Sequence, residues 1–108
     1  LMDDKTLVVV SSDFTHYGFS YGFVPFEKPE KNFEAYDKNI IKEILKPTGK
    51  GFYDKASRGT ICGIYGIAVL IELAKIKKWK GKLIDYSTSA EVSGDWSSVV
   101  GYAGIVFE

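Results

Sequence analysis

Two side chains able to move a proton stand close together in the stretch SSDFTHYG. Asp13 and His16 are three residues apart, and His16 is the only histidine in the chain. A carboxylate beside an imidazole orients the ring, fixes its tautomer and raises its basicity. The spacing therefore predicts a catalytic pair made of Asp13 and His16. The same residues also fit a second interpretation, in which Asp13 caps a turn and His16 is structural.

A third reactive side chain, Cys62, lies in the stretch GTICGIYG, just before a long apolar run. Backbone N–H groups and the helix dipole at a helix start stabilise a thiolate, the form that binds soft metals or attacks electrophiles. Gly63 and Gly66 would let another group approach this helix start closely. The alternative interpretation is a small, buried, apolar cysteine.

The elements around these residues predict an α/β fold, a mixed sheet with flanking helices. The β-branched run at 6–10 predicts a strand buried on both faces, typical of a parallel sheet. In such sheets ligands bind beyond the carboxyl ends of the strands. This places Ser11, Ser12, Asp13 and His16 at a pocket. The polar stretch 86–96 either lines the same pocket or forms local turns.

The remaining pattern predicts helices followed by strands. A long loop at 19–32 precedes a helix capped by Asn32 and stopped by Pro47. The helix places apolar side chains on one face: Phe33, Tyr36, Ile40, Ile41, Ile44 and Leu45. A short helical turn follows within 48–60. The run 60–81 is apolar around most of its circumference, which predicts a central buried helix from Thr60, closed by Gly81. The stretch 82–91 predicts a strand that runs into a Ser/Thr-rich loop, and 97–108 predicts a final strand. Together these elements form one α/β unit, residues 1–108, with no internal domain boundary.

Composition narrows the function classes. Of the 108 residues, 45% are hydrophobic, and the 14 basic residues balance the 14 acidic ones. This balance argues against a role on nucleic acid or at a membrane surface that bulk charge would drive. The basic run 75–82 is interpreted as a solvated helix end. A single cysteine excludes an internal disulfide and predicts an intracellular, cytoplasmic protein. The abrupt start on a strand predicts a fragment or a split chain.

Three segments together resemble the Memo family, which includes the AmmeMemoRadiSam system protein B group. They are SSDFTHYG, TICG before an apolar helix, and YSTSAEVSGDWSSVVGYAGIVF. Their order and spacing also fit the family, and they match the C-terminal half of its longer members. The resemblance implies a fold similar to class III extradiol dioxygenases.

The resemblance further implies a pocket for iron or copper, held by two histidines of the first half and one cysteine of the second. Cys62 matches that cysteine, and Asp13 and His16 match pocket residues. The two first-half histidines have no counterpart here, so this chain supplies part of a metal site. Gly66 stands where the family commonly has a proline, which loosens the helix start.

Two functions follow as expectations. In the first, the chain forms one wall of a redox-metal pocket with oxidoreductase, dioxygenase-like chemistry, completed by a missing N-terminal half or by a homo-oligomer. In the second, the pocket recognises a protein or peptide without catalysis, and the aromatic-rich loop 14–26 supplies the anchors.

Overall fold

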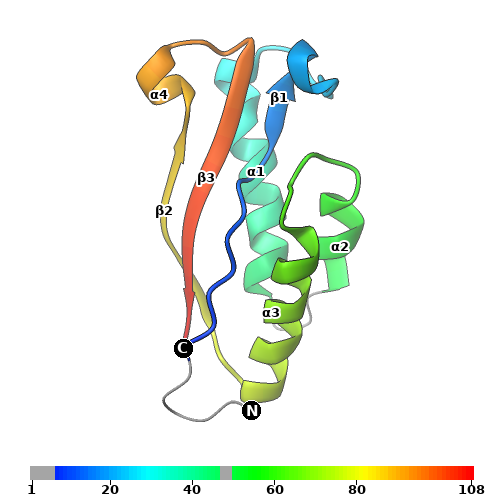
Figure 1. The fold of residues 1–108 in the computed structure, drawn as a ribbon, viewed down its shortest axis with the longest axis vertical. Coiled ribbons are helices and arrows are strands. Elements are labelled where there is room, and N and C mark those ends of the chain that lie inside the picture. The colour runs from blue at the N-terminus through cyan, green and yellow to red at the C-terminus, as the bar shows by residue number, and fades with distance from the viewer. Residues whose placement is uncertain (1–6, 47–49) are drawn as a thin grey trace.

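A three-stranded antiparallel sheet with helices packed beside it forms the fold (Figure 1). The computed structural model describes residues 7–46 and 50–108. The strand order is β1-β3-β2, so the long C-terminal strand lies in the middle. The elements are β1 (His16–Gly18), the 3-10 helix η1 (Phe19–Tyr21), α1 (Pro29–Leu45), α2 (Lys50–Ala56), α3 (Ile64–Lys77), β2 (Gly81–Thr88), α4 (Ala90–Ser93) and β3 (Ser98–Phe107).

The α/β class predicted from sequence is confirmed, but the pairing differs from the parallel arrangement expected for the first strand. Both β1 and β2 pair with β3 in antiparallel register, with Tyr17 opposite Val99 and Tyr86 opposite Ala103. The register shifts between Leu83 and Asp85 of β2, which pair with the adjacent residues Ile105 and Gly104 of β3 and so form a bulge.

The strand expected at 6–10 is wrong over its described residues, 7–10, while Thr6 lies outside the described residues. Leu7–Val10 runs extended between β3 and α3 without strand pairing (Figure 1). Leu7 and Val9 are 85% and 77% exposed, whereas Val10 packs against the core. A β-branched run favours extended backbone, but a strand also needs a partner at its edge. The first regular pairing with β3 comes at His16.

The helix α1 begins three residues before the predicted cap. Pro29 occupies the first turn, after Lys28 in a left-handed conformation with φ 52°. Asn32 is inside the helix, and its Nδ2 donates to the Glu27 carbonyl at 2.8 Å. The predicted apolar face is confirmed, since Phe33, Ile40, Ile41 and Ile44 are buried. The short helical turn predicted within 48–60 is confirmed as α2, while Pro47, the predicted stop of the preceding helix, lies outside the described residues.

The predicted long apolar helix is confirmed as α3, but its limits and its burial differ from the prediction. It follows Gly63 and ends at Lys77, and the left-handed Lys78 is its C-cap, so neither Thr60 nor Gly81 closes it. Only one side is buried, through Ile67, Ile71 and Ala74. The expectation that it is covered all round is wrong, because the described elements pack against one face only.

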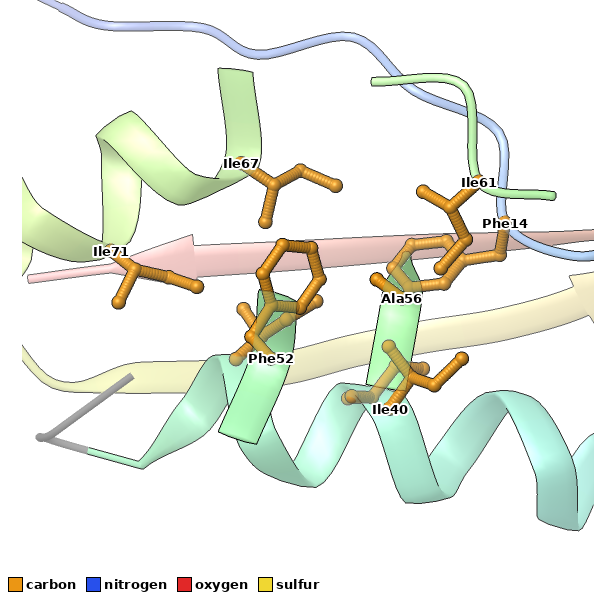
Figure 2. Close-up of a cluster of buried hydrophobic side chains, with 9 residues drawn as sticks. Phe14, Ile40, Phe52, Ala56, Ile61, Ile67 and Ile71 are labelled. Carbon is orange, nitrogen blue, oxygen red and sulfur yellow. The ribbon is translucent and has the colours of Figure 1, made fainter. Parts of the chain in front are cut away.

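The core lies between this face of α3, the helices α1 and α2, and the strands. Figure 2 shows Phe52 of α2 among side chains from α1, α3 and the segment that bears Phe14. Its buried members are Phe14, Ile40, Ile41, Ile44, Phe52, Ala56, Ile61, Ile67 and Ile71. Burial of these side chains holds in place the two stretches that carry Asp13, His16 and Cys62. In residues 7–46 and 50–108, no helix combines the length and apolar character needed to cross a bilayer.

Candidate functional site

Two stretches far apart in sequence meet at the candidate site: residues 11–16 and the turn 60–63 before α3. The Ser12 Oγ accepts a hydrogen bond from the Gly63 N–H at 2.8 Å and donates to the Asp13 carbonyl at 2.7 Å. A Cβ at Gly63 would collide with the Ser12 side chain, and one at Gly66 would lie 3.1 Å from Val10 Cγ1. The predicted close approach at these glycines is confirmed, and the approaching group is the chain's own segment.

His16 is held by Thr60 through three hydrogen bonds. The His16 N–H donates to Thr60 Oγ1 at 2.7 Å, and the same hydroxyl donates to the His16 carbonyl at 2.9 Å. The ring Nδ1 lies 3.0 Å from the Thr60 carbonyl oxygen. Because a carbonyl only accepts, Nδ1 carries the proton in the neutral ring. The Nε2 atom is therefore left with its lone pair.

The Nε2 atom of His16 faces Asp13. It lies 3.7 Å from Asp13 Oδ2, and the His16 and Asp13 side chains are 22% and 50% exposed. The Tyr21 ring meets the imidazole edge-on, with centroids 5.1 Å apart. Asp13 can therefore stabilise an imidazolium formed by protonation at Nε2. The fold brings the predicted pair together at a partly open surface.

Cys62 lies two residues before the first residue of α3, as the sequence predicted. Its thiol is exposed, so the alternative of a buried apolar cysteine is wrong. Its Sγ is 3.8 Å from Ser12 Oγ, and Ser12 adjoins Asp13 in the chain. The turn 60–63 thus connects both reactive groups: Thr60 holds His16, and Cys62 lies against Ser12.

The polar stretch 86–96 is used mainly for local structure. Ser89 Oγ accepts from the Val100 N–H at 3.0 Å, and Asp95 accepts from the Ser97 N–H at 2.9 Å. The hydrogen bonds to Asp95 lower the pKa of its carboxyl. These contacts favour the local-turn interpretation over a place in the pocket with Asp13 and His16.

A buried carboxylate that sequence reasoning missed lies behind the site. Asp37, on the sheet-facing side of α1, is fully buried. Its Oδ1 accepts from the Thr15 N–H at 3.1 Å, and its Oδ2 accepts from the Tyr86 hydroxyl at 2.6 Å. A Cβ at Gly101 would overlap Oδ2, so glycine in β3 makes room for this carboxylate. Asp37 therefore joins α1, β2 and the residue just before His16.

Burial is the largest cause of the raised pKa values of Asp37 and Tyr86. It raises the pKa of Asp37, and the hydrogen bonds from Thr15 and Tyr86 oppose that shift. Burial and the neighbouring Asp37 charge together raise the pKa of Tyr86. A sequence signal for Asp37 did exist: it falls at helical spacing from Phe33 and Ile41 on an otherwise apolar stripe.

Whether these residues could bind a metal depends on how many ligand side chains lie together. In the part of the chain that the structure describes, no three His, Cys, Asp or Glu side chains come together as a metal would need. Protein sites for zinc, iron or copper use at least three protein ligands. As an exposed thiol, Cys62 has the chemistry of one soft ligand, but the described residues supply no complete set of ligands around it.

Comparison with known proteins agrees with this fold and these motifs. The profile of the family described as Memo-like protein matches residues 1–106. A MEMO1 family protein of Thermococcus onnurineus is 35% identical over 114 residues, which cover 98% of this chain and 39% of that relative. A MEMO1 family protein of Thermococcus kodakarensis is 37% identical over 109 residues, 94% of this chain and 37% of the relative. A MEMO1 family protein of Nitrosopumilus maritimus is 40% identical over 108 residues, which cover 95% of this chain and 35% of that relative.

The protein is thus an α/β chain in which the Asp13–His16 pair lies beside the turn that carries Cys62. It belongs to the Memo-like family. The chain spans little more than a third of the length of the curated relatives it matches.

Proposed function

We propose that this chain forms one wall of a Memo-type redox pocket. In this proposal Asp13 and His16 handle a proton, and Cys62 is a soft ligand for iron or copper. The observation that carries the proposal is the His16 geometry: the ring donates from Nδ1 to Thr60, which leaves the Nε2 lone pair facing Asp13. The bound metal would supply one-electron or oxygen chemistry, as in an oxidoreductase of the dioxygenase-like class.

The residues of this chain have separate tasks in that pocket. Neutral His16 accepts a proton at Nε2, and the Asp13 carboxylate, 3.7 Å away, stabilises the imidazolium that forms. Release of the proton restores the neutral ring. The exposed Cys62 thiol sits beside the N-terminal end of α3, where the helix dipole favours a thiolate.

The rest of the site is proposed to come from outside these residues. The curated relatives are more than twice as long as the match, so the remaining ligands can come from the N-terminal half of a Memo-type protein. A second copy of the chain is the other source. A lone accessible thiol fits the reducing cytoplasm, which is the proposed location.

Metal titration under anaerobic conditions tests this proposal. The purified chain should not retain stoichiometric iron or copper through gel filtration, because Cys62 alone cannot complete a site. Titration with Co²⁺ should nevertheless produce a thiolate-to-metal absorption band that Cys62→Ala removes. Ser87→Ala, a change outside the pocket, should leave the band unchanged.

Two results would overturn the metal part of the proposal. One is tight, stoichiometric metal on a monomer of this chain. The other is the absence of any thiolate band at high Co²⁺ concentration, with the thiol shown to be reduced.

A non-catalytic binding role is the second candidate, and the exposed aromatics beside the site favour it. Phe19 is 90% exposed, and Tyr21, 43% exposed, touches His16. Phe14 and Tyr17 are buried, so only the tip of the predicted aromatic loop can supply anchors. Loss of partner or peptide binding in Phe19→Ala, with the cobalt band unchanged, would favour this role over the first.

A further inference from the structure

The imidazole of His16 is fixed by contacts that lie outside the Asp13–His16 pair. Thr60 provides a hydroxyl that both accepts from the His16 N–H and donates to the His16 carbonyl, at 2.7 and 2.9 Å. It also provides the carbonyl that faces Nδ1 at 3.0 Å. The main chain and the ring of His16 are therefore held by one residue of the turn before α3.

A second contact holds the residue just before His16. The Thr15 N–H donates to the buried Asp37 carboxylate at 3.1 Å, and the Thr15 carbonyl accepts from the Gly101 N–H at 3.0 Å. Tyr86 occupies the other carboxylate oxygen. Thr15 is thus tied to α1 and to β3 while His16 is tied to the turn 60–63.

The Thr60 contacts and the Asp37 contact both determine where the Nε2 atom of His16 points. The neutral imidazole exchanges between two tautomers unless a neighbour accepts from one nitrogen. The Thr60 carbonyl accepts at Nδ1 only if the His16 main chain stays where the Thr60 hydroxyl and the Asp37 carboxylate hold it. Second contacts of this kind set the tautomer of functional histidines in other sites.

We propose that Thr60 and Asp37 are positioning residues that keep His16 in the Nδ1–H tautomer, with the Nε2 lone pair open to the pocket. This inference rests on the proposed function for its purpose, but its test needs neither metal nor turnover. The Thr60 hydroxyl is the dominant part, because it alone contacts both main-chain groups of His16.

The single histidine makes the test direct. In a histidine-labelled chain, long-range ¹H–¹⁵N correlation spectra contain one ring only. The two nitrogens of the neutral ring report the tautomer, so the spectra are recorded at alkaline pH. The wild-type chain should show a protonated Nδ1 and an unprotonated Nε2.

The Thr60 variants separate positioning from packing. Thr60→Val keeps the shape and the carbonyl but removes the hydroxyl, and it should give a mixture of tautomers. Thr60→Ser restores the hydroxyl and should restore the wild-type pattern. The matched control is Thr88→Val, since Thr88 is buried and its Oγ1 has no hydrogen-bond partner in the described residues. This control should keep the wild-type tautomer.

The Asp37 variants test the second anchor. Asp37→Leu removes both acceptors, so exchange of the Thr15 amide should speed up by roughly tenfold or more and the tautomers should mix. Asp37→Asn keeps an oxygen for the Thr15 N–H and can donate to the Tyr86 oxygen, so it should behave like wild type.

Clear outcomes would overturn the inference. A wild-type ring protonated at Nε2 would contradict it, and this result needs no variant to fold. A folded Thr60→Val chain with the wild-type tautomer would exclude the hydroxyl as a positioning group. Either result would leave the cobalt band of Cys62 untouched, so failure here is distinguishable from failure of the proposed metal role.

Discussion

The two ends of the turn before α3 lead to regions with opposite properties. On one side, Thr60, His16 and Asp37 form a polar cluster whose main groups find partners within the chain. On the other side, the outer face of α3 presents Tyr65 and Val69, which are 72% and 66% exposed. The His16 main chain and the Asp37 carboxylate have hydrogen-bond partners where chemistry is proposed, although the buried Thr15 hydroxyl has none in the described residues. Apolar surface is uncovered on the outer face of α3, where no chemistry is proposed.

The outer face of α3 is a second apolar stripe on one helix. At 3.6 residues per turn, Tyr65, Val69 and Ile76 fall within about 40° of each other, on the side opposite the buried Ile71. A helix that is apolar on both sides is typical of the interior of a larger protein. The contacts that position His16 therefore come from within this chain. The outer face of α3, in contrast, is an apolar surface that no described element covers.

The largest expected difference in stability is between substitutions on the buried face and on the exposed face of α3. Ile71→Ala removes a side chain that is 4% exposed and should lower the free energy of unfolding by about 2–5 kcal/mol. Val69→Ala, two residues earlier, should change it by no more than about 0.5 kcal/mol. Urea denaturation followed by circular dichroism measures both. Equal losses at the two positions would contradict the one-sided burial of α3.

Two glycines of β3 should also respond differently. Gly101→Ala places a methyl group against the Asp37 carboxylate and should cost about 1–3 kcal/mol. Gly104→Ala meets no atom within 4 Å and should be nearly neutral. Thermal unfolding of the pair tests the cluster. If Gly101→Ala were tolerated as well as Gly104→Ala, Asp37 would not lie against β3.

The buried Asp37 should leave a pH signature on stability. Its pKa is raised in the folded state, so its stabilising contribution is complete below the ordinary value of about 3.9 and is lost as pH rises through the folded value. The stability advantage of wild type over Asp37→Asn should therefore shrink as the pH rises from about 4 to about 7.

Denaturation of both chains across this range measures the difference. The lowered pKa values of Glu43 and Asp95 act in the opposite direction, but they are common to both chains and cancel. Tyr36 and Tyr86, whose pKa values are raised, stay protonated throughout the range. A difference that widens in favour of wild type with rising pH would contradict the account.

The smallest effect on stability is expected from a charge on the uncovered face. Val69→Lys should leave the free energy of unfolding within about 0.5 kcal/mol of wild type but reduce self-association and binding of an apolar dye. Light scattering and dye fluorescence measure this. Glu72→Lys, an equally exposed position between the apolar residues, is the charge control. A wild-type chain that is monomeric and binds no dye would show that the face needs no cover.

Periodicity and composition predicted the elements better than their limits. The apolar stripe with Phe33 and Ile40 predicted α1, and the uninterrupted apolar run predicted α3. Threonine before an apolar run predicts a helix cap at Thr60, but the Thr60 hydroxyl instead accepts a hydrogen bond from the His16 N–H. The segment 7–10 has the composition of a strand, but pairing depends on a neighbour that local sequence does not specify.

The proximity of Asp13 and His16 was predictable from the sequence, but the contacts that hold them in place were not. Asp13 and His16 are neighbours in sequence, so a turn brings them together. The contact of Thr60 with His16 spans 44 residues, and that of Asp37 with Thr15 spans 22. Such contacts arise from the packing of α1 and of the turn 60–63 against the sheet, which no local pattern encodes.

A chimera tests the central claim, that this chain is one wall of a Memo-type metal pocket, most directly. Residues 1–108 would replace the matching stretch of the Thermococcus kodakarensis relative, and iron and copper would be measured after anaerobic purification. The account predicts stoichiometric metal in the chimera, lost in its Cys62→Ala form and kept in its Ser87→Ala form. A folded chimera that carries no metal, or whose metal content does not depend on Cys62, would contradict the account.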